Sequence, residues 1–175
     1  MKKLCAGILL VLSFELCAYE PKEYDFVRFK LGAASFRDQS TELTGFSGGK
    51  VAFEYSRVLN SYESKWFESY LEFSVSPLHH VDLNDRRRFN VSSYTAGVSF
   101  SYNFWKRSVL RVRAGGGLTT LDQTDISHTD LGVSKAMLTK GGHEFSINLN
   151  AKLLVTHYED QMHLTSVDLS YGYNF

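Results

Sequence analysis

Cysteine, proline and long apolar runs are scarce in this chain of 175 residues. It has two prolines, and its two cysteines, Cys5 and Cys17, both lie within the first 18 residues. No apolar stretch approaches the roughly 20 residues that a membrane-spanning helix needs, so the sequence excludes a helical membrane protein. Lys and Arg together number 19, as do Asp and Glu. This balance provides no basic field, and we therefore expect no nucleic-acid partner.

Aromatic residues, by contrast, are plentiful. The chain has 10 Tyr, 13 Phe and 2 Trp, which make up 14% of it, and 13 Gly. Aromatic side chains favour strands, whereas proline is restricted within sheets. The composition therefore favours long strands joined by turns, and the length favours a single domain.

The N-terminus has the layout of a secretory signal peptide. Two lysines form a basic start, residues 4–14 are an apolar core, and Ala18 is a small residue at the expected cleavage position. We predict a signal over residues 1–18 and a mature domain over residues 19–175. That domain would contain no cysteine, although small exported domains usually need disulfides or another link. A closed barrel in a membrane would supply the missing stability.

The mature region alternates apolar and polar residues from end to end and contains no convincing helix. This period of two predicts eight strands, near residues 25–35, 48–58, 66–76, 91–104, 108–120, 129–139, 143–157 and 163–175. Strands of about ten residues can cross a membrane when tilted, and short turns alternating with longer loops are typical of outer-membrane barrels. The predicted fold class is all-β, an eight-stranded antiparallel up-and-down transmembrane β-barrel.

The polar face of these strands carries charges of both signs. Six cations stand against five anions: Arg28, Lys30, Lys50, Arg111, Arg113 and Lys152 against Glu54, Glu68, Glu72, Glu144 and Asp168. A barrel of eight strands has no room for a pore, so side chains must fill its lumen. Buried charges can do this only when they are paired. We therefore expect an internal charge network, with Arg28 opposite Glu54 and Lys50 opposite Glu72.

Alternation alone leaves a soluble alternative open. A secreted lipocalin-like barrel would place the apolar face inside, around a ligand cavity. The apolar face is rich in Phe and Tyr, however, and aromatic residues collect at one end of several strands, as in an interfacial girdle: Phe67, Tyr102, Phe104, Tyr173 and Phe175. This distribution favours the membrane barrel.

The last residues, Tyr171-Gly-Tyr-Asn-Phe175, resemble the C-terminal signature of bacterial outer-membrane barrels. These proteins end in an aromatic residue, usually Phe, with apolar or aromatic residues at alternate positions before it. The whole layout is similar to the small eight-stranded barrels of that superfamily, such as outer membrane proteins A and X and the opacity-type antigens. The resemblance implies a place in the outer membrane of a Gram-negative bacterium, among its lipid and lipopolysaccharide. It also implies that the barrel-assembly machinery reads Tyr171, Tyr173 and Phe175. No subfamily is identified.

The function that the sequence favours is a structural or adhesive one at the cell surface, without enzymatic activity, cofactor or metal. The histidines and aspartate within residues 79–82 lack the spacing of a metal site. An enzymatic alternative stays open, because some barrels of this superfamily modify lipid A, and one such family uses a His-x-Ser motif near the outer rim. His163-Leu-Thr165 is similar, with His157 across the last hairpin, but threonine replaces the serine.

Overall fold

The computed structural model describes residues 25–38, 45–80, 88–121, 123–155 and 161–175. The expected signal, residues 1–18, lies outside them. Eight antiparallel strands follow one another along the chain: β1 (Asp25–Asp38), β2 (Phe46–Tyr62), β3 (Lys65–His80), β4 (Arg88–Trp105), β5 (Ser108–Leu121), β6 (Thr124–Leu138), β7 (His143–Val155) and β8 (Gln161–Asn174). Within the described ranges, no helix has the length and hydropathy needed to cross a bilayer.

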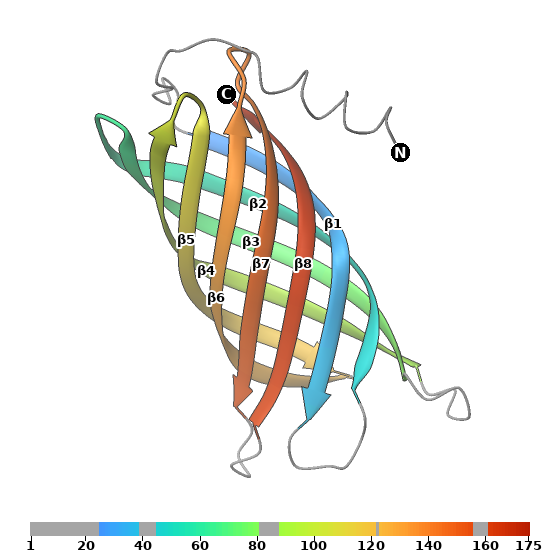
Figure 1. The fold of residues 1–175 in the computed structure, drawn as a ribbon. Helices are drawn as coiled ribbons and strands as arrows, with labels where there is room; N and C mark the ends of the chain where they lie inside the picture. The colour runs from blue at the N-terminus through green and yellow to red at the C-terminus, as the bar shows by residue number, and fades with distance from the viewer. Residues whose placement is uncertain (1–24, 39–44, 81–87, 122, 156–160) are drawn as a thin grey trace, which may run out of the picture.

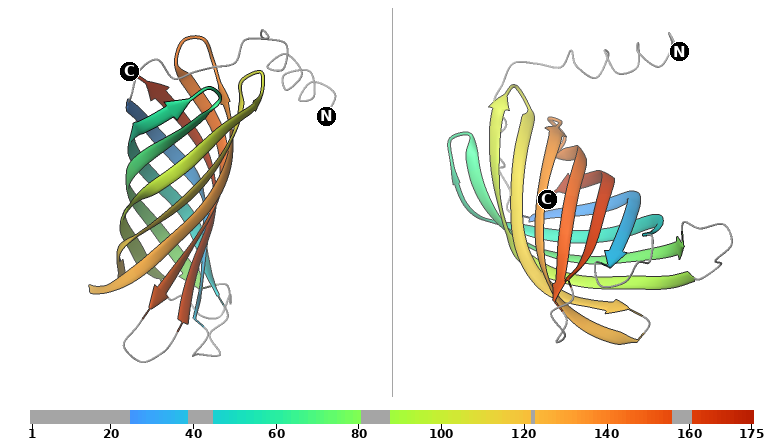
Figure 2. Two further views of the ribbon diagram at one scale, coloured as in Figure 1. Left: turned by 90° about the vertical axis from the view of Figure 1, so that its left-hand side faces the viewer. Right: turned by 60° about the horizontal axis from the view of Figure 1, so that its bottom comes forward.

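Each strand pairs with the next, and β8 pairs with β1, so the sheet closes into a barrel. Figures 1 and 2 show the strands tilted around the barrel axis. The predicted fold class, an eight-stranded up-and-down barrel, is confirmed. Closure leaves no unpaired edge along the wall, which stabilises a sheet that has no disulfide.

The two ends of the barrel differ. At the turn end, β2–β3, β4–β5 and β6–β7 join through short turns, and the C-terminus lies close by. At the loop end, the connections span residues 39–45, 81–87, 122–123 and 156–160. Several strands run further toward the loop end than the sequence predicted. For example, β3 continues to His80 and β6 begins at Thr124.

Alternate residues point into the lumen and outward, and the charged face is the inner one. On β8, Asp168 is 0% exposed whereas its neighbour Leu169 is 64% exposed. The same inversion holds on β2, where Glu54 is buried and Phe53 is 50% exposed. This is the reverse of a lipocalin-like barrel, so the soluble alternative does not fit the structure.

One expected strand register is wrong. Arg28 faces Glu54 between β1 and β2, but on β3 the residue opposite Glu54 is Glu72, so Lys50 and Glu72 are not cross-strand partners. The predicted strands 48–58 and 66–76 leave a turn over residues 59–65, whereas β2 continues through a bulge to Tyr62 and turns only at residues 63–64.

Candidate functional site

A buried ionic network fills the middle of the lumen. On its turn-end side, the Arg28 guanidinium lies 2.8 Å from Glu54, 3.0 Å from Glu68 and 2.9 Å from Glu144. Arg111 on β5 contacts the last two carboxylates, at 3.3 Å and 2.9 Å. Two arginines and three carboxylates from five different strands thus hold one another across the barrel, with charge-assisted hydrogen bonds.

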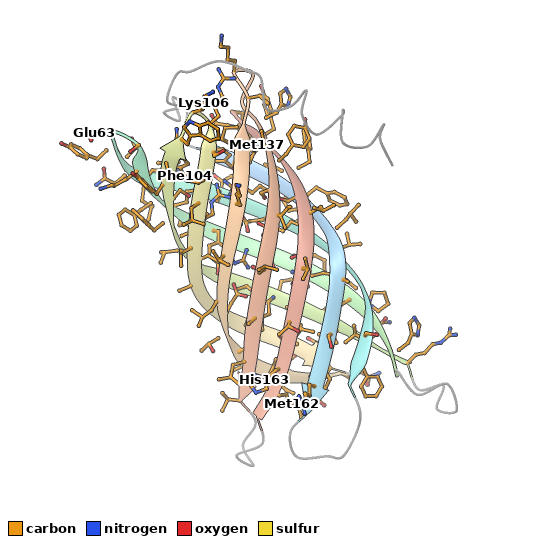
Figure 3. All side chains as sticks on the ribbon, viewed as in Figure 1. Glu63, Phe104, Lys106, Met137, Met162 and His163 are labelled. Atoms are coloured by element: carbon orange, nitrogen blue, oxygen red, sulfur yellow. The ribbon has the colours of Figure 1, made fainter. Side chains whose placement is uncertain are left out.

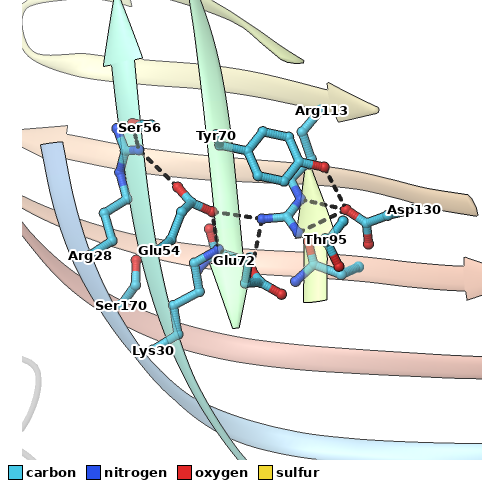
Figure 4. A network of polar contacts seen from close by, with 12 residues as sticks. Arg28, Lys30, Glu54, Ser56, Tyr70, Glu72, Thr95, Arg113, Asp130 and Ser170 are labelled. Atoms are coloured by element: carbon cyan, nitrogen blue, oxygen red, sulfur yellow. Dashed lines mark hydrogen bonds and ion pairs between the residues drawn. The ribbon is translucent and has the colours of Figure 1, made fainter. Parts of the chain in front are cut away.

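Arg113 is the centre of the next layer (Figure 4). Its guanidinium lies 2.8 Å from Glu54, 3.0 Å from Glu72 and 2.8 Å from Asp130. The Tyr70 hydroxyl donates to the same Asp130 oxygen over 2.8 Å, and the guanidinium carbon lies 4.5 Å from the centre of the Tyr70 ring. Arg113 is therefore held by three carboxylates and an aromatic face.

Two lysines complete the network toward the loop end. The Lys50 ammonium lies 2.9 Å from Asp168 and 3.7 Å from Glu72, although the register does not pair Lys50 with Glu72 directly. Lys152 also lies 3.7 Å from Glu72 and donates to the Thr95 hydroxyl over 2.9 Å. Long lysine side chains reach carboxylates that a simple cross-strand pairing would not predict.

The structure places all eleven residues of the expected network in the lumen, each no more than 5% exposed. The sequence reasoning missed Asp130, which is 1% exposed on β6. With it, the described residues bury six Lys or Arg side chains and six carboxylates in the lumen. The signal was available, because Asp130 alternates with Leu131 and Val133 on the strand that had the weakest pattern. The lumen is therefore balanced in charge.

Apolar side chains close both ends of the lumen, and the sequence reasoning missed this as well. A loop-end cap consists of Ala34, Phe36, Phe46, Leu78, Val91, Leu154 and Leu164. A turn-end cap consists of Phe26, Val58, Trp66, Val109, Ala136 and Leu138. Between them, a void bounded by network side chains such as Arg28 and Arg111 has a volume of about 10 Å³, which is room for about one water molecule. In the described part of the barrel, side chains therefore fill the lumen from one cap to the other.

The candidate rim site lies at the loop end of β8. His163, labelled in Figure 3, shares the outward face with Thr165 and stands opposite Arg37 of β1. The Thr165 hydroxyl donates to the Ser35 backbone carbonyl over 3.4 Å. His157 lies outside the described residues. In the part of the chain that the structure describes, no group of three or more His, Cys, Asp or Glu side chains is placed to hold a metal ion.

The C-terminal signature faces outward at the turn end. Tyr171, Tyr173 and Phe175 are between 44% and 49% exposed, and the Phe175 backbone N–H donates to the Asp25 carbonyl over 3.0 Å. The residues expected to form a girdle are likewise exposed on this side: Phe67, Tyr102 and Phe104. The last residues therefore close the barrel and present aromatic rings on its outer surface.

No protein-family model and no curated protein sequence matches the chain. Similar solved structures include Neisserial surface protein A, at 8% identity and a TM-score of 0.56, over 86% of this chain and 97% of that one. The attachment invasion locus protein Ail of Yersinia pestis and the outer membrane enzyme PagL each show 9% identity and a TM-score of 0.53, over 86% of this chain and 99% of theirs. The chain has the fold of the small eight-stranded outer-membrane β-barrels.

Proposed function

We propose that this protein is a non-enzymatic barrel of the outer membrane of a Gram-negative bacterium, with a structural or adhesive role at the cell surface. The observation that carries the proposal is the inverted wall, which buries charges and exposes large apolar side chains. Such a continuous apolar exterior is costly in water and is stable in lipid. In this role the wall contacts membrane lipid and lipopolysaccharide.

The filled lumen argues against a transport function. Two apolar caps and a paired ionic network leave no route for a solute, so the protein acts through its surfaces. The loop end offers the connections 39–45 and 81–87, which are the longest between strands. The names of two proteins with this fold, a surface protein and an attachment invasion locus protein, are consistent with an interaction there. The aromatic C-terminal residues would direct assembly through the barrel-assembly machinery.

A lipid A-modifying hydrolase with a site at His163 is the second candidate. His163 and Thr165 share one outward face at the loop end, where such a substrate would lie, and one protein with this fold is an outer membrane enzyme. The hydroxyl of Thr165, which would be the nucleophile, donates to the Ser35 backbone carbonyl over 3.4 Å. We therefore place the hydrolase second.

Cell fractionation combined with lipid analysis tests the proposal. The protein should be recovered with the outer membrane, and it should run faster on a gel when the sample is not boiled, because a lipid-stable barrel resists detergent. Mass spectrometry of lipid A from wild-type and deletion strains should show the same acyl pattern. Recovery in the soluble periplasm would contradict the membrane location, and an altered acyl pattern would favour the hydrolase.

A further inference from the structure

Three lysines form a patch on the outer wall at the turn end: Lys65 on β3, Lys106 in the β4–β5 turn and Lys135 on β6. We call these three residues the lysine patch. Lys65 and Lys135 belong to one cross-strand row, because Lys65 is opposite Tyr102, Tyr102 is opposite Leu110, and Leu110 is opposite Lys135. Three strand spacings separate the two lysines by roughly 14 Å. The patch is therefore a strip along the wall rather than a single pocket.

Aromatic rings hold two of these ammonium groups at the surface. The Lys65 ammonium lies 5.8 Å from the centre of the Tyr102 ring, and the Lys106 ammonium lies 4.9 Å from that of Trp105. Trp105 is 59% exposed and Tyr102 is 39% exposed. Figure 3 labels Lys106 and Phe104, which both lie at this end of the barrel. The cations thus sit among the rings of the girdle, where the interface of a membrane would lie.

The charge of the patch is not balanced locally. Lys65, Lys106, Lys135 and Arg107 are basic, and Glu63 is the acidic residue in the adjoining turn. No ion pair joins a lysine of the patch to a carboxylate among the described residues, whereas every lysine and arginine of the lumen network has at least one carboxylate within 4 Å. Lys65 and Lys135 are exposed and Lys106 is half-buried, and a strip of cations without carboxylate partners attracts anions from the surroundings.

We propose that the lysine patch binds the phosphate groups of anionic phospholipids in the leaflet at the turn end, an inference that rests on the proposed membrane location. The next row toward the middle of the wall is apolar and exposed, with Phe67 and Val112 available to acyl chains. The lysines would bind the phosphate of a phospholipid, and the apolar row would contact its acyl chains. Lys65 and Lys135 lie on strands and project sideways from the wall, whereas a soluble partner would meet the turns, where Lys106 lies.

The protein contains its own reporter of the bound lipid. Of its two tryptophans, Trp66 lies in the turn-end cap and is 1% exposed, whereas Trp105 lies within the patch and faces outward. Brominated acyl chains quench a tryptophan that they contact. Quenching in lipid mixtures therefore reports which lipid occupies the wall beside Trp105, against an unquenched signal from Trp66.

The experiment uses the folded protein in vesicles of phosphatidylcholine and phosphatidylglycerol, with either lipid brominated. We expect phosphatidylglycerol to be preferred beside Trp105 by about fivefold, the effect of one basic group near an anionic surface. The ratio of phosphatidylglycerol to phosphatidylcholine beside Trp105, relative to the bulk mixture, should fall toward one at high salt. It should also fall toward one in the triple variant with Lys65→Gln, Lys106→Gln and Lys135→Gln. The control Arg37→Gln, an exposed cation at the loop end, should keep the preference.

The outcomes separate this inference from the proposed function. Equal quenching by both brominated lipids would contradict lipid binding by the lysine patch, but it would still support membrane insertion. No quenching by either lipid would show that the wall does not face lipid and would overturn both. Should the triple variant fail to fold on an unboiled gel, the single Lys135→Gln variant provides the test, because the Lys135 side chain is exposed and forms no ion pair with a described carboxylate. An unchanged preference in that folded variant would contradict the proposal.

Discussion

Each buried charge in this barrel is tolerable because several partners surround it. Removing an isolated ion from water costs several kcal/mol, and only close, hydrogen-bonded counter-charges offset that cost. Asp168 illustrates this, since its Oδ2 accepts from Lys50 and from the Asn150 amide, each over 2.9 Å. Loss of one member of such a set leaves its partner with a buried charge that is no longer compensated, which destabilises the fold.

The Lys50 and Asp168 pair gives a direct test of this dependence. Asp168→Asn should lower the free energy of unfolding by about 3 kcal/mol, because it leaves a buried ammonium whose remaining carboxylate is more distant. Combining it with Lys50→Met should restore part of that loss. Urea unfolding of the reconstituted protein measures both. Arg57→Gln, at an exposed pair 3.9 Å from Asp25, should change the value by less than about 0.5 kcal/mol. A double variant no more stable than the single ones would contradict the coupling.

The same residue scale shows what alternation can and cannot predict. Eleven lumen charges were predictable because each shares a strand with a clear apolar face. Asp130 was predictable in principle but lay on the strand with the weakest alternation. The pairing of Arg28 with Glu54 was predictable, because the two residues are opposite each other on adjacent strands. Other pairings were not predictable, because Lys50 and Arg113 reach across the lumen to strands that are not their neighbours.

At the scale of elements, the number of strands follows from the sequence, but their ends do not. Phe36 and Phe46 lie at the limits of β1 and β2 and point inward, whereas the surrounding polar residues suggested a loop from residue 36. An inward apolar residue at a strand end breaks the polar-inside pattern, so period two alone places it in a loop. The caps went unpredicted for this reason.

Glycines on β4 and β5 make room for Tyr70, which positions Asp130. A Cβ atom added at Gly115 would lie 2.5 Å from the Tyr70 hydroxyl oxygen and 2.5 Å from the Ala96 carbonyl. Gly115→Ala should therefore force the ring or the wall to move and destabilise the barrel by about 1–3 kcal/mol, measured by urea unfolding. Gly49→Ala is the matched control, because a Cβ there meets nothing within 4 Å. Equal stability of the two variants would show that the ring has space to spare.

At the scale of the whole molecule, the lumen is a series of closed layers. An ion entering from the loop end would meet an apolar cap, then the lysine and carboxylate layers, then the cap around Trp66. The apolar caps offer no ligands to replace the hydration shell of an ion. Each charged side chain of the network has an opposite charge within 4 Å, although one oxygen each of Glu72, Asp130 and Asp168 has no hydrogen-bond partner among the described residues. The block to ion passage through the lumen thus depends on several layers of side chains rather than on a single gate.

Conductance measurements test whether the layers act in series. In planar lipid bilayers, the native protein should show no steady single-channel current. Phe36→Ser with Leu78→Ser opens the loop-end cap, yet this variant should also stay silent, because the Lys50 and Lys152 layer beneath is 3–4% exposed and remains filled. Steady current steps from the native barrel would contradict a sealed lumen. Steps from the cap variant alone would instead show that the cap is the only barrier, and that the ionic layers beneath it admit water and ions.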